Sequence, residues 1–300
     1  MLSGMEIAII GGDLRQIEVI RKLSALDATL HLIGFNNVDD GFLEAEKKEF
    51  GTTNPESLDA VILPVSGMDT NNEVESIFSG NPLVLERDWV KKTSSNTRFY
   101  TGVANKTLKS LISEENRELI EVMTRDDLAI YNSIPTAEGT IMLVIQHTNV
   151  TIHKANVTVV GFGRVGQTIA NKFHGLGANV TVVAEEEALL ARAYEMNVNP
   201  KPLDELSNVV CHADVVINTI PSLIITSHVI SQMPSHVFII DLASKPGGTD
   251  FEFAKKRSIK AMLAPGLPGL VAPKTAGLQL AQLLSVLLKD QWIELTEGRT

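Results

Sequence analysis

A glycine-rich turn is the clearest chemical signature in this 300-residue chain. The turn follows the apolar stretch 156–160 and precedes a stretch with apolar residues at helical spacing. Glycines between a buried strand and a helix permit a tight turn, close approach of a pyrophosphate and close helix–strand packing. The helix N-terminus would add N–H donors and the positive end of its dipole. The segment predicts a dinucleotide site containing Gly161, Gly163, Arg164, Val165 and Gly166.

A carboxylate follows at the spacing that a dinucleotide ribose requires. Glu185 lies 24 residues after Gly161, at the end of the next predicted strand, where it can accept hydrogen bonds from ribose hydroxyls. Glu186 and Glu187 come next, and three carboxylates disfavour a 2′-phosphate. These residues favour NAD over NADP, although Arg164 or Arg192 could reach a phosphate. A structural glycine turn with no ligand is the alternative interpretation.

Three further loops, rich in Gly and Pro, follow other predicted strands of the second half. They span 218–221, 243–248 and 264–269, the last continuing into 271–277. Each loop alone is as well explained as a turn, but the carboxyl ends of parallel strands meet at one edge of a sheet, where α/β folds bind ligands. Together they predict a nicotinamide and substrate pocket, with cofactor contacts from Thr219, Ile220, Pro221, Ala243 and Gly266.

Charged and polar side chains complete the predicted site. Because the formal charge is −10, an anionic ligand must be met by local cations. Each cation, taken alone, is better explained as a solvated surface charge than as a ligand, and Glu138 is better explained as a partner of a helix dipole than as a base. We predict catalytic roles for Glu138 and Lys245, and substrate binding by Arg15, Ser66, Asn132, Thr136 and Lys274.

An internal repeat positions these residues. The pattern of strand, turn, helix and strand over residues 6–33 recurs, shifted by 150 residues, over 156–183. In the first copy the glycine positions hold Gly11, Asp13 and Gln16, and Phe35 replaces the acidic residue. A carboxylate at the second glycine position would repel a pyrophosphate. The first half therefore keeps the fold but not the dinucleotide site, and serves either substrate binding in a cleft facing the cofactor or structure alone.

Short apolar runs alternate with helical stretches along both halves, which is typical of parallel strands buried on both faces. The pattern predicts an α/β protein with two doubly wound, Rossmann-like parallel-sheet domains joined by long helices. Expected strands cover 59–63, 83–85, 98–100, 214–218, 237–241 and 259–263; expected helices cover 107–125, 135–147 with Pro135 in its first turn, and 276–288. The predicted organisation is a substrate or partner domain (1–125), an interdomain helix (126–148), a dinucleotide domain (149–275) and a helix packing back across the domains (276–300).

Composition narrows the class of protein. Hydrophobic residues make up 44% and charged residues 21%, as in soluble globular chains. The excess of 36 acidic over 26 basic residues argues against nucleic acid and anionic membranes as partners, and no run approaches a membrane span. Cys211 is the single cysteine, which predicts a reducing, cytoplasmic location. The seven histidines show no metal-ligand spacing, so we predict no metal.

Four segments in this order resemble a known family. They are the opening Ile9-Ile-Gly-Gly-Asp13, the linker Arg125–Thr140, the loop Asp241-Leu-Ala-Ser-Lys-Pro-Gly-Gly-Thr-Asp250 and Leu263-Ala-Pro-Gly-Leu-Pro-Gly269. The chain resembles the A subunits of dipicolinate synthase from spore-forming bacteria, nearly end to end.

The resemblance implies oxidation of dihydrodipicolinate, or its hydroxy-tetrahydro form, to pyridine-2,6-dicarboxylate with a nicotinamide cofactor. It implies that the partner is the flavoprotein-like B subunit of dipicolinate synthase, and that expression occurs in the mother cell during sporulation; we also expect an oligomer. The family's Arg-Ser turn suits NADP, whereas Glu185 and its two neighbours argue for NAD.

The second half also resembles, more distantly, the cofactor domain of D-2-hydroxyacid dehydrogenases. Those enzymes carry a Pro-His pair after the last strand, where this chain has Pro265-Gly266, and an Arg where it has Ser244 and Lys245. Hydroxyacid chemistry is therefore not supported. A D-2-hydroxyacid dehydrogenase-like reductase and a non-catalytic nucleotide-binding subunit remain the alternatives.

Overall fold

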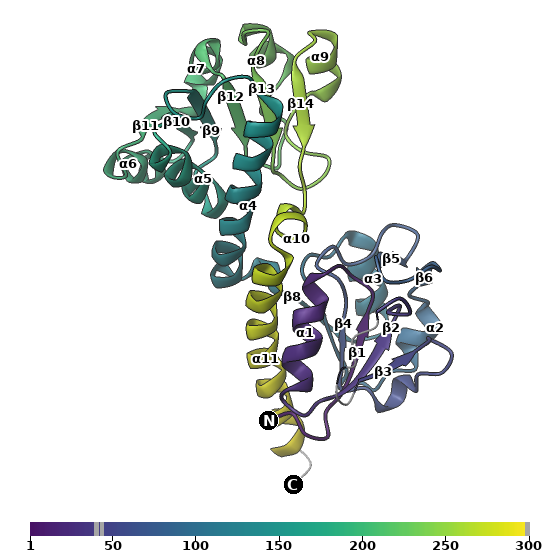
Figure 1. Ribbon diagram of the computed structural model, residues 1–300. Helices are drawn as coiled ribbons and strands as arrows, with labels where there is room; N and C mark the ends of the chain where they lie inside the picture. Colours follow the sequence, from purple (N-terminus) through teal and green to yellow (C-terminus); the bar gives the residue numbers. More distant parts are fainter. Residues whose placement is uncertain (39–41, 43–44, 298–300) are drawn as a thin grey trace. The chain divides into compact units, whose positions relative to one another are not determined.

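The computed structural model describes residues 1–38, 42 and 45–297. The chain forms two compact units, one of Met1–Ala129 with Ala272–Thr300 and one of Ile130–Val271. Each unit contains a six-stranded parallel sheet flanked by helices (Figure 1). The predicted α/β class with two doubly wound sheets is confirmed.

The sheet of the first unit has the strand order β3-β2-β1-β4-β7-β8. Its apolar strands are buried on both faces by helices, as the sequence predicted. The strands are β1 (Glu6–Ile10), β2 (Thr29–Ile33), β3 (Ala45–Lys48), β4 (Ala60–Ile62), β7 (Arg98–Thr101) and β8 (Glu118–Glu121). The helices are α1 (Arg15–Ser24), α2 (Arg87–Lys91), α3 (Lys106–Glu114) and α11 (Pro273–Glu297), with 3₁₀ turns at Pro55–Ser57 and Val122–Thr124.

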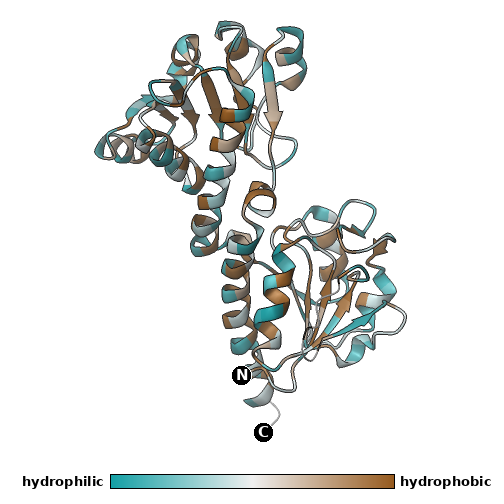
Figure 2. Cartoon of the chain, in the orientation of Figure 1, coloured by the Kyte–Doolittle hydropathy of each residue, from teal (hydrophilic) through white to brown (hydrophobic). Residues whose placement is uncertain are grey.

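The second unit repeats this topology in the order β11-β10-β9-β12-β13-β14. Its strands are β9 (Asn156–Val160), β10 (Asn179–Ala184), β11 (Asn199–Pro202), β12 (Val215–Asn218), β13 (Phe238–Asp241) and β14 (Lys260–Leu263). Its helices are α5 (Arg164–Gly175), α6 (Glu187–Glu195), α7 (Leu206–Val209), α8 (Ser227–Gln232), α9 (Phe251–Lys256) and α10 (Leu267–Val271), with 3₁₀ turns at Leu203–Glu205 and Val210–His212. Figure 2 shows the hydrophobic strands within each unit and the polar outer faces of its helices.

The 150-residue repeat is visible in the strand boundaries. β1 and β9 begin and end at equivalent positions, and β2 and β10 begin at equivalent positions. In each sheet the order reverses beside the first strand of the repeat, between β1 and β4 and between β9 and β12. Doubly wound folds bind ligands beside the carboxyl ends of the strands, at the point where the strand order reverses.

Two helix predictions were wrong. Residues 107–125 do not form one helix, because α3 ends at Glu114, Asn116 takes a left-handed conformation, and Glu118–Glu121 becomes the sixth strand. The second helix is α4 (Asp126–His147), which begins nine residues earlier than expected and carries Pro135 in its interior. Proline removes one helical hydrogen bond, and here the surrounding helix continues on both sides of it.

The expected strand at 83–85 also differs. It forms β6 (Leu83–Val84), which pairs antiparallel with β5 (Glu73–Val74) outside the parallel sheet. The other predicted strands of both halves are present, with β4 shorter than predicted.

Two long helices lie where the chain passes from one compact unit to the other. α4 begins in the first unit and continues in the second from Ile130 on, while α11 belongs to the first unit. α4 is also long and apolar enough to cross a membrane by length and composition alone. Half of its apolar window is buried, and Ala137, Leu143 and Val144 join the core of the second unit, as in core helices of soluble proteins.

Candidate nucleotide site

Each glycine of the predicted turn is required, or leaves space, for a different structural reason. Gly161 has φ +91°, and a Cβ there would lie 2.4 Å from the Thr219 hydroxyl oxygen. A Cβ on Gly166 would lie 2.2 Å from the carbonyl oxygen of Gly161, so this glycine allows α5 to pack on the end of β9. A Cβ on Gly163, by contrast, would have no atom within 4 Å of it, which leaves open space beside the α5 N-terminus. This is the arrangement that a pyrophosphate requires.

Strand ends hold the turn in place. The Gly161 N–H donates to the Val183 carbonyl over 2.8 Å, and the Gln167 side chain donates to the Phe162 carbonyl over 3.0 Å. The Thr219 hydroxyl donates to the Val160 carbonyl over 2.9 Å. Thr219 therefore packs against the glycine turn, although its hydroxyl is already used by the backbone.

Glu185 stands at the carboxyl end of the strand next to the one that leads into the glycine turn. It directly follows β10, the neighbour of β9, and its side chain is exposed, as are those of Glu186 and Glu187. Glu186 precedes the first residue of α6. Arg192, one of the two arginines considered for binding a 2′-phosphate, already forms an ion pair of 3.0 Å with Glu195 on α6.

The loops after β12, β13 and β14 follow the carboxyl ends of neighbouring strands, as the sequence predicted. Ile220 contacts the turn, since a Cβ on Gly161 would lie 2.8 Å from it. Pro221, Lys245 and Gly266 are exposed, whereas Ala243 is buried. In the sequence, Asn218 and Asp241 are only the first residues of two of the segments singled out, with no role assigned to either. The structure shows both as buried polar residues at the roots of the loops.

The remaining candidates of the second unit lie on α4. Glu138 is exposed, and Asn132 and Thr136 are half-buried. The Thr136 hydroxyl donates to the Asn132 carbonyl over 2.8 Å. Ser133 and Thr168 share a hydrogen bond of 2.6 Å between their hydroxyls, which links α4 to α5 near Asn132 and Thr136.

The first unit carries the other substrate candidates. Arg15 is buried, and its Nε and Nη2 donate to both carboxylate oxygens of Asp13 at 2.7–3.1 Å. Burial alone would raise the pKa of Asp13, but the hydrogen bonds and charge of Arg15 outweigh it and hold that pKa below its ordinary value. Ser66 and Lys274 are exposed. Lys274 lines an open cavity of about 430 Å³ with Leu14, Ile17 and Phe78.

The glycine turn of the first unit is covered by its own chain. The Gly12 N–H donates to the Glu75 carbonyl over 2.7 Å, and the Ile77 N–H donates to the Gly12 carbonyl over 3.0 Å. A Cβ on Gly11 would lie 2.6 Å from the same Glu75 carbonyl. Phe35, in the position of the ribose acid, stacks on Phe78 with ring centroids 5.2 Å apart. The segment around Glu75 thus fills the space that a pyrophosphate would need.

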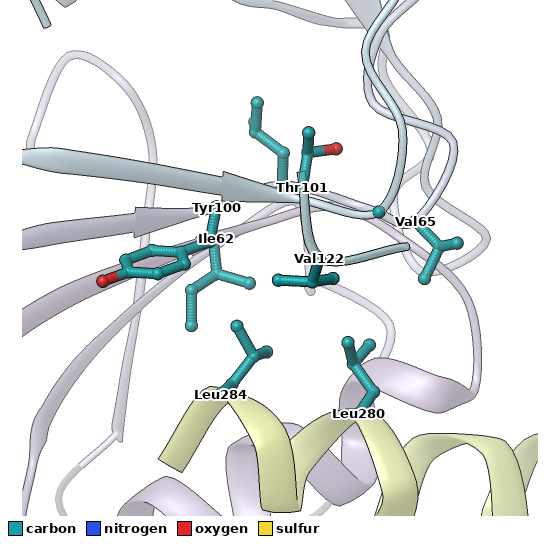
Figure 3. A pocket seen from close by; sticks show the side chains of 9 residues that line it. Ile62, Val65, Tyr100, Thr101, Val122, Leu280 and Leu284 are labelled. Atoms are coloured by element: carbon teal, nitrogen blue, oxygen red, sulfur yellow. The ribbon is translucent and has the colours of Figure 1, made fainter. Parts of the chain in front are cut away.

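A small void near α11 does not serve as a site. It measures about 10 Å³ and lies between the sheet and the helix, lined mainly by apolar side chains such as Ile62, Val122, Leu280 and Leu284 (Figure 3). A void of this size barely holds one water, and a water needs polar partners. Of the polar lining residues, Tyr100 donates to Gln291 and Thr101 donates to the Pro64 carbonyl.

The fold and the glycine turn define a dinucleotide-type site, and the family model matched by the second unit makes the protein an oxidoreductase with a dehydrogenase-type, nicotinamide-binding domain. Residues 138–244 match the family model of the D-isomer specific 2-hydroxyacid dehydrogenase NAD binding domain. Residues 6–123 match the model of the N-terminal domain of the dipicolinate synthase A subunit.

Full-length relatives make the assignment specific. The chain is 48% identical over 299 residues to the dipicolinate synthase A subunit of Bacillus subtilis (strain 168), with 100% of both sequences covered. A crystal structure of the dipicolinate synthase A subunit from Bacillus halodurans matches with 52% identity and a TM-score of 0.93, covering 96% of this chain and 99% of that one. The A chain of the Bacillus subtilis enzyme matches with 49% identity and a TM-score of 0.92, covering 98% and 99%. The chain belongs to the family of dipicolinate synthase A subunits.

Proposed function

We propose that this chain is the dehydrogenase subunit that forms dipicolinate from dihydrodipicolinate or its hydroxy-tetrahydro form. The observation that carries the proposal is the full-length match to a dipicolinate synthase A subunit. The space beside Gly163 at the start of α5, where a pyrophosphate could lie, is consistent with it. The name of the relatives also supports a second, partner polypeptide. We further propose that this partner is a flavoprotein-like B subunit, that the assembly is oligomeric, and that it works in the cytoplasm of the sporulating mother cell.

The proposed reaction makes modest chemical demands. Dihydrodipicolinate loses one hydride and one proton, and the ring becomes aromatic; the hydrated form also loses water. The nicotinamide accepts the hydride when bound. The chain must orient a dianion and accept one proton, so positioning contributes more than strong acid–base catalysis. We assign the proton to Glu138, the substrate carboxylates to Arg15, Lys245 and Lys274, and supporting contacts to Ser66, Asn132 and Thr136.

A reconstituted assay tests the proposal directly. The purified chain, with and without the B subunit, is given dihydrodipicolinate and NAD or NADP, and both the reduced cofactor and dipicolinate are measured. Equal amounts of both products support the proposal. Turnover of a 2-hydroxyacid instead would favour the reductase alternative. Cofactor binding without turnover of either substrate, even with the B subunit, would favour a non-catalytic nucleotide-binding role.

We propose NAD as the preferred cofactor because Glu185, Glu186 and Glu187 are all exposed directly after β10. A carboxylate about 4 Å from a phosphate charge costs about 1 kcal/mol in water and about 4 kcal/mol at an effective dielectric of 20. A lost ribose hydrogen bond adds about 1 kcal/mol. We expect kcat/KM to favour NAD by about tenfold or more.

The variant Glu185→Arg tests this preference, since it replaces the carboxylate with a phosphate-binding cation. We expect the NAD to NADP ratio of kcat/KM to fall at least tenfold. The matched control is Glu56→Arg, at an exposed glutamate in the 3₁₀ turn Pro55–Ser57 of the first unit, which should leave the ratio unchanged. A clear NADP preference in the unmodified protein would contradict the assignment of Glu185 to the ribose.

A further inference from the structure

Two buried polar side chains stand at neighbouring strand ends in the second unit. Asn218 ends β12 and Asp241 ends β13, the two pair in register, and each is 0% exposed. Buried carboxylates and amides are rare unless hydrogen-bonded, so each calls for a structural reason.

The Asp241 carboxylate organises the loop that follows it. One oxygen accepts the Ala243 N–H over 3.0 Å. The other accepts the Gly248 N–H over 2.8 Å and the Thr249 hydroxyl over 2.6 Å. The loop 243–248 is therefore tied to the strand at both of its ends.

Asn218 fixes the neighbouring loop in the same way. Its side-chain oxygen accepts the Ile220 N–H over 3.1 Å, and its Nδ2 donates to the Ile220 carbonyl over 3.0 Å. A Cβ on Gly248 would lie 2.6 Å from that Nδ2, so the two loops touch at the Asn218 amide. Ile220 in turn packs against Gly161. The polar groups thus join the glycine turn and both loops into one connected framework.

Strand order decides which part of a dinucleotide this framework faces. The glycine turn follows β9, and Glu185 follows β10 on one side of it, where the adenosine ribose is proposed to bind. β12 and β13 lie on the other side of β9. A dinucleotide whose pyrophosphate lies on the turn must extend its second half over the loops of β12 and β13.

We propose that Asp241, Thr249 and Asn218 are positioning residues that hold these two loops against the nicotinamide half of the bound dinucleotide. They act through the loop backbone and do not themselves touch the reacting atoms. The inference rests on the proposed binding of a nicotinamide dinucleotide in this unit, but not on the identity of the substrate.

Two ligands that differ by the nicotinamide half test the proposal. ADP reports on the glycine turn and the Glu185 side, whereas NADH also reports on the two loops. In the full-length protein we expect NADH to bind more tightly than ADP. Thr249→Val and Asp241→Asn should each raise the Kd of NADH about fivefold or more, which corresponds to the loss of one charge-assisted hydrogen bond. Both variants should leave the Kd of ADP within about twofold of its original value. Both affinities are measured by calorimetric titration.

Conservative and remote variants separate positioning from simple destabilisation. Thr249→Ser keeps the hydroxyl donor and should restore NADH affinity. Thr181→Val removes a side-chain hydrogen bond with Asn199 in the same sheet, away from the loops, and should change the affinity for neither ligand. The proposal would be overturned if the variants weakened NADH binding and ADP binding equally, or left NADH affinity unchanged. It would also be overturned if the unmodified protein bound NADH no more tightly than ADP. These titrations need no turnover, so a failed dipicolinate assay would not affect them.

Discussion

At the scale of single residues, the three glycines of the nucleotide turn show why a short motif was informative here. Their roles differ, since Gly161 adopts a positive φ, Gly166 allows backbone contact and Gly163 faces open space. The sequence predicted all three from spacing and flanking elements alone. It gave no role to Asn218 or Asp241, although each begins a segment that the sequence singled out, because the partners of one amide and one carboxylate emerge only when the loops are folded.

The glycine roles predict opposite outcomes for two similar substitutions. Gly163→Ala places its methyl group in open space, so stability should be retained while the Kd of ADP rises about tenfold, because the methyl group meets the incoming phosphate. Gly166→Ala places its methyl group against the Gly161 carbonyl and should lower stability as well. Thermal unfolding and ADP titration of both variants check this. Tight ADP binding by a stable Gly163→Ala protein would contradict the assignment of the phosphate site.

The pair of Asp13 and Arg15 predicts a pH dependence in the first unit. Because the pKa of Asp13 is lowered on folding, its contribution to stability is complete above the unfolded pKa, near 3.9, and is lost as pH falls toward the folded value. Asp13→Asn should therefore cost about 1–2 kcal/mol at pH 7, the worth of a partly exposed, charge-assisted pair. The difference from the unmodified protein should shrink below about pH 4.

Tryptophan fluorescence provides the measurement, because both tryptophans, Trp89 and Trp292, lie in the first unit. Urea unfolding of the two proteins is compared at several pH values. A stability difference that persists unchanged at pH 3 would show that the Asp13 carboxylate charge is not its source.

At the scale of elements, the repeat was predictable and its interruptions were not. Apolar runs at the 150-residue offset indicated the first strands, the turn and the helix of each unit. The antiparallel pairing of β5 with β6 and the segment around Glu75 that covers Gly12 could not be predicted, because they depend on tertiary contacts between very short segments. The preference of Pro135 for a first turn also misplaced the start of α4, because packing of residues on both sides of it, such as Leu128 and Ala137, keeps the helix continuous.

The packing of α11 on the first sheet makes a stability prediction. Leu284 is 2% exposed and borders the existing void, so Leu284→Ala enlarges a cavity that neighbours cannot easily fill. We expect a loss of about 2–5 kcal/mol in the tryptophan-monitored unfolding. Leu278 on the same helix is 49% exposed, and Leu278→Ala should change stability by no more than about 0.5 kcal/mol. Similar losses in both variants would mean that α11 does not pack through this face.

At the scale of the whole molecule, the two units share one strand topology but differ at the glycine turn. The second keeps an open glycine turn, while the first has filled the equivalent space with Glu75 and the Phe35–Phe78 stack. Since its turn is covered, the first unit shares the topology of the second but has space for a different task. The proposed task is to bind the substrate, and the family name adds a second polypeptide to the functional assembly.

Exposure of the candidate proton acceptor predicts dependence on that second polypeptide. Glu138 is exposed, whereas catalytic acids and bases are ordinarily tuned by burial and by neighbouring groups. We expect the chain alone to bind NADH normally but to form dipicolinate at less than about one tenth of the rate reached with the B subunit, since general acid–base catalysis contributes at least that factor. Titrating the B subunit into the assay should raise kcat to saturation while the Kd of NADH stays constant. Full turnover by the isolated chain would show that it needs no partner to complete its catalytic site.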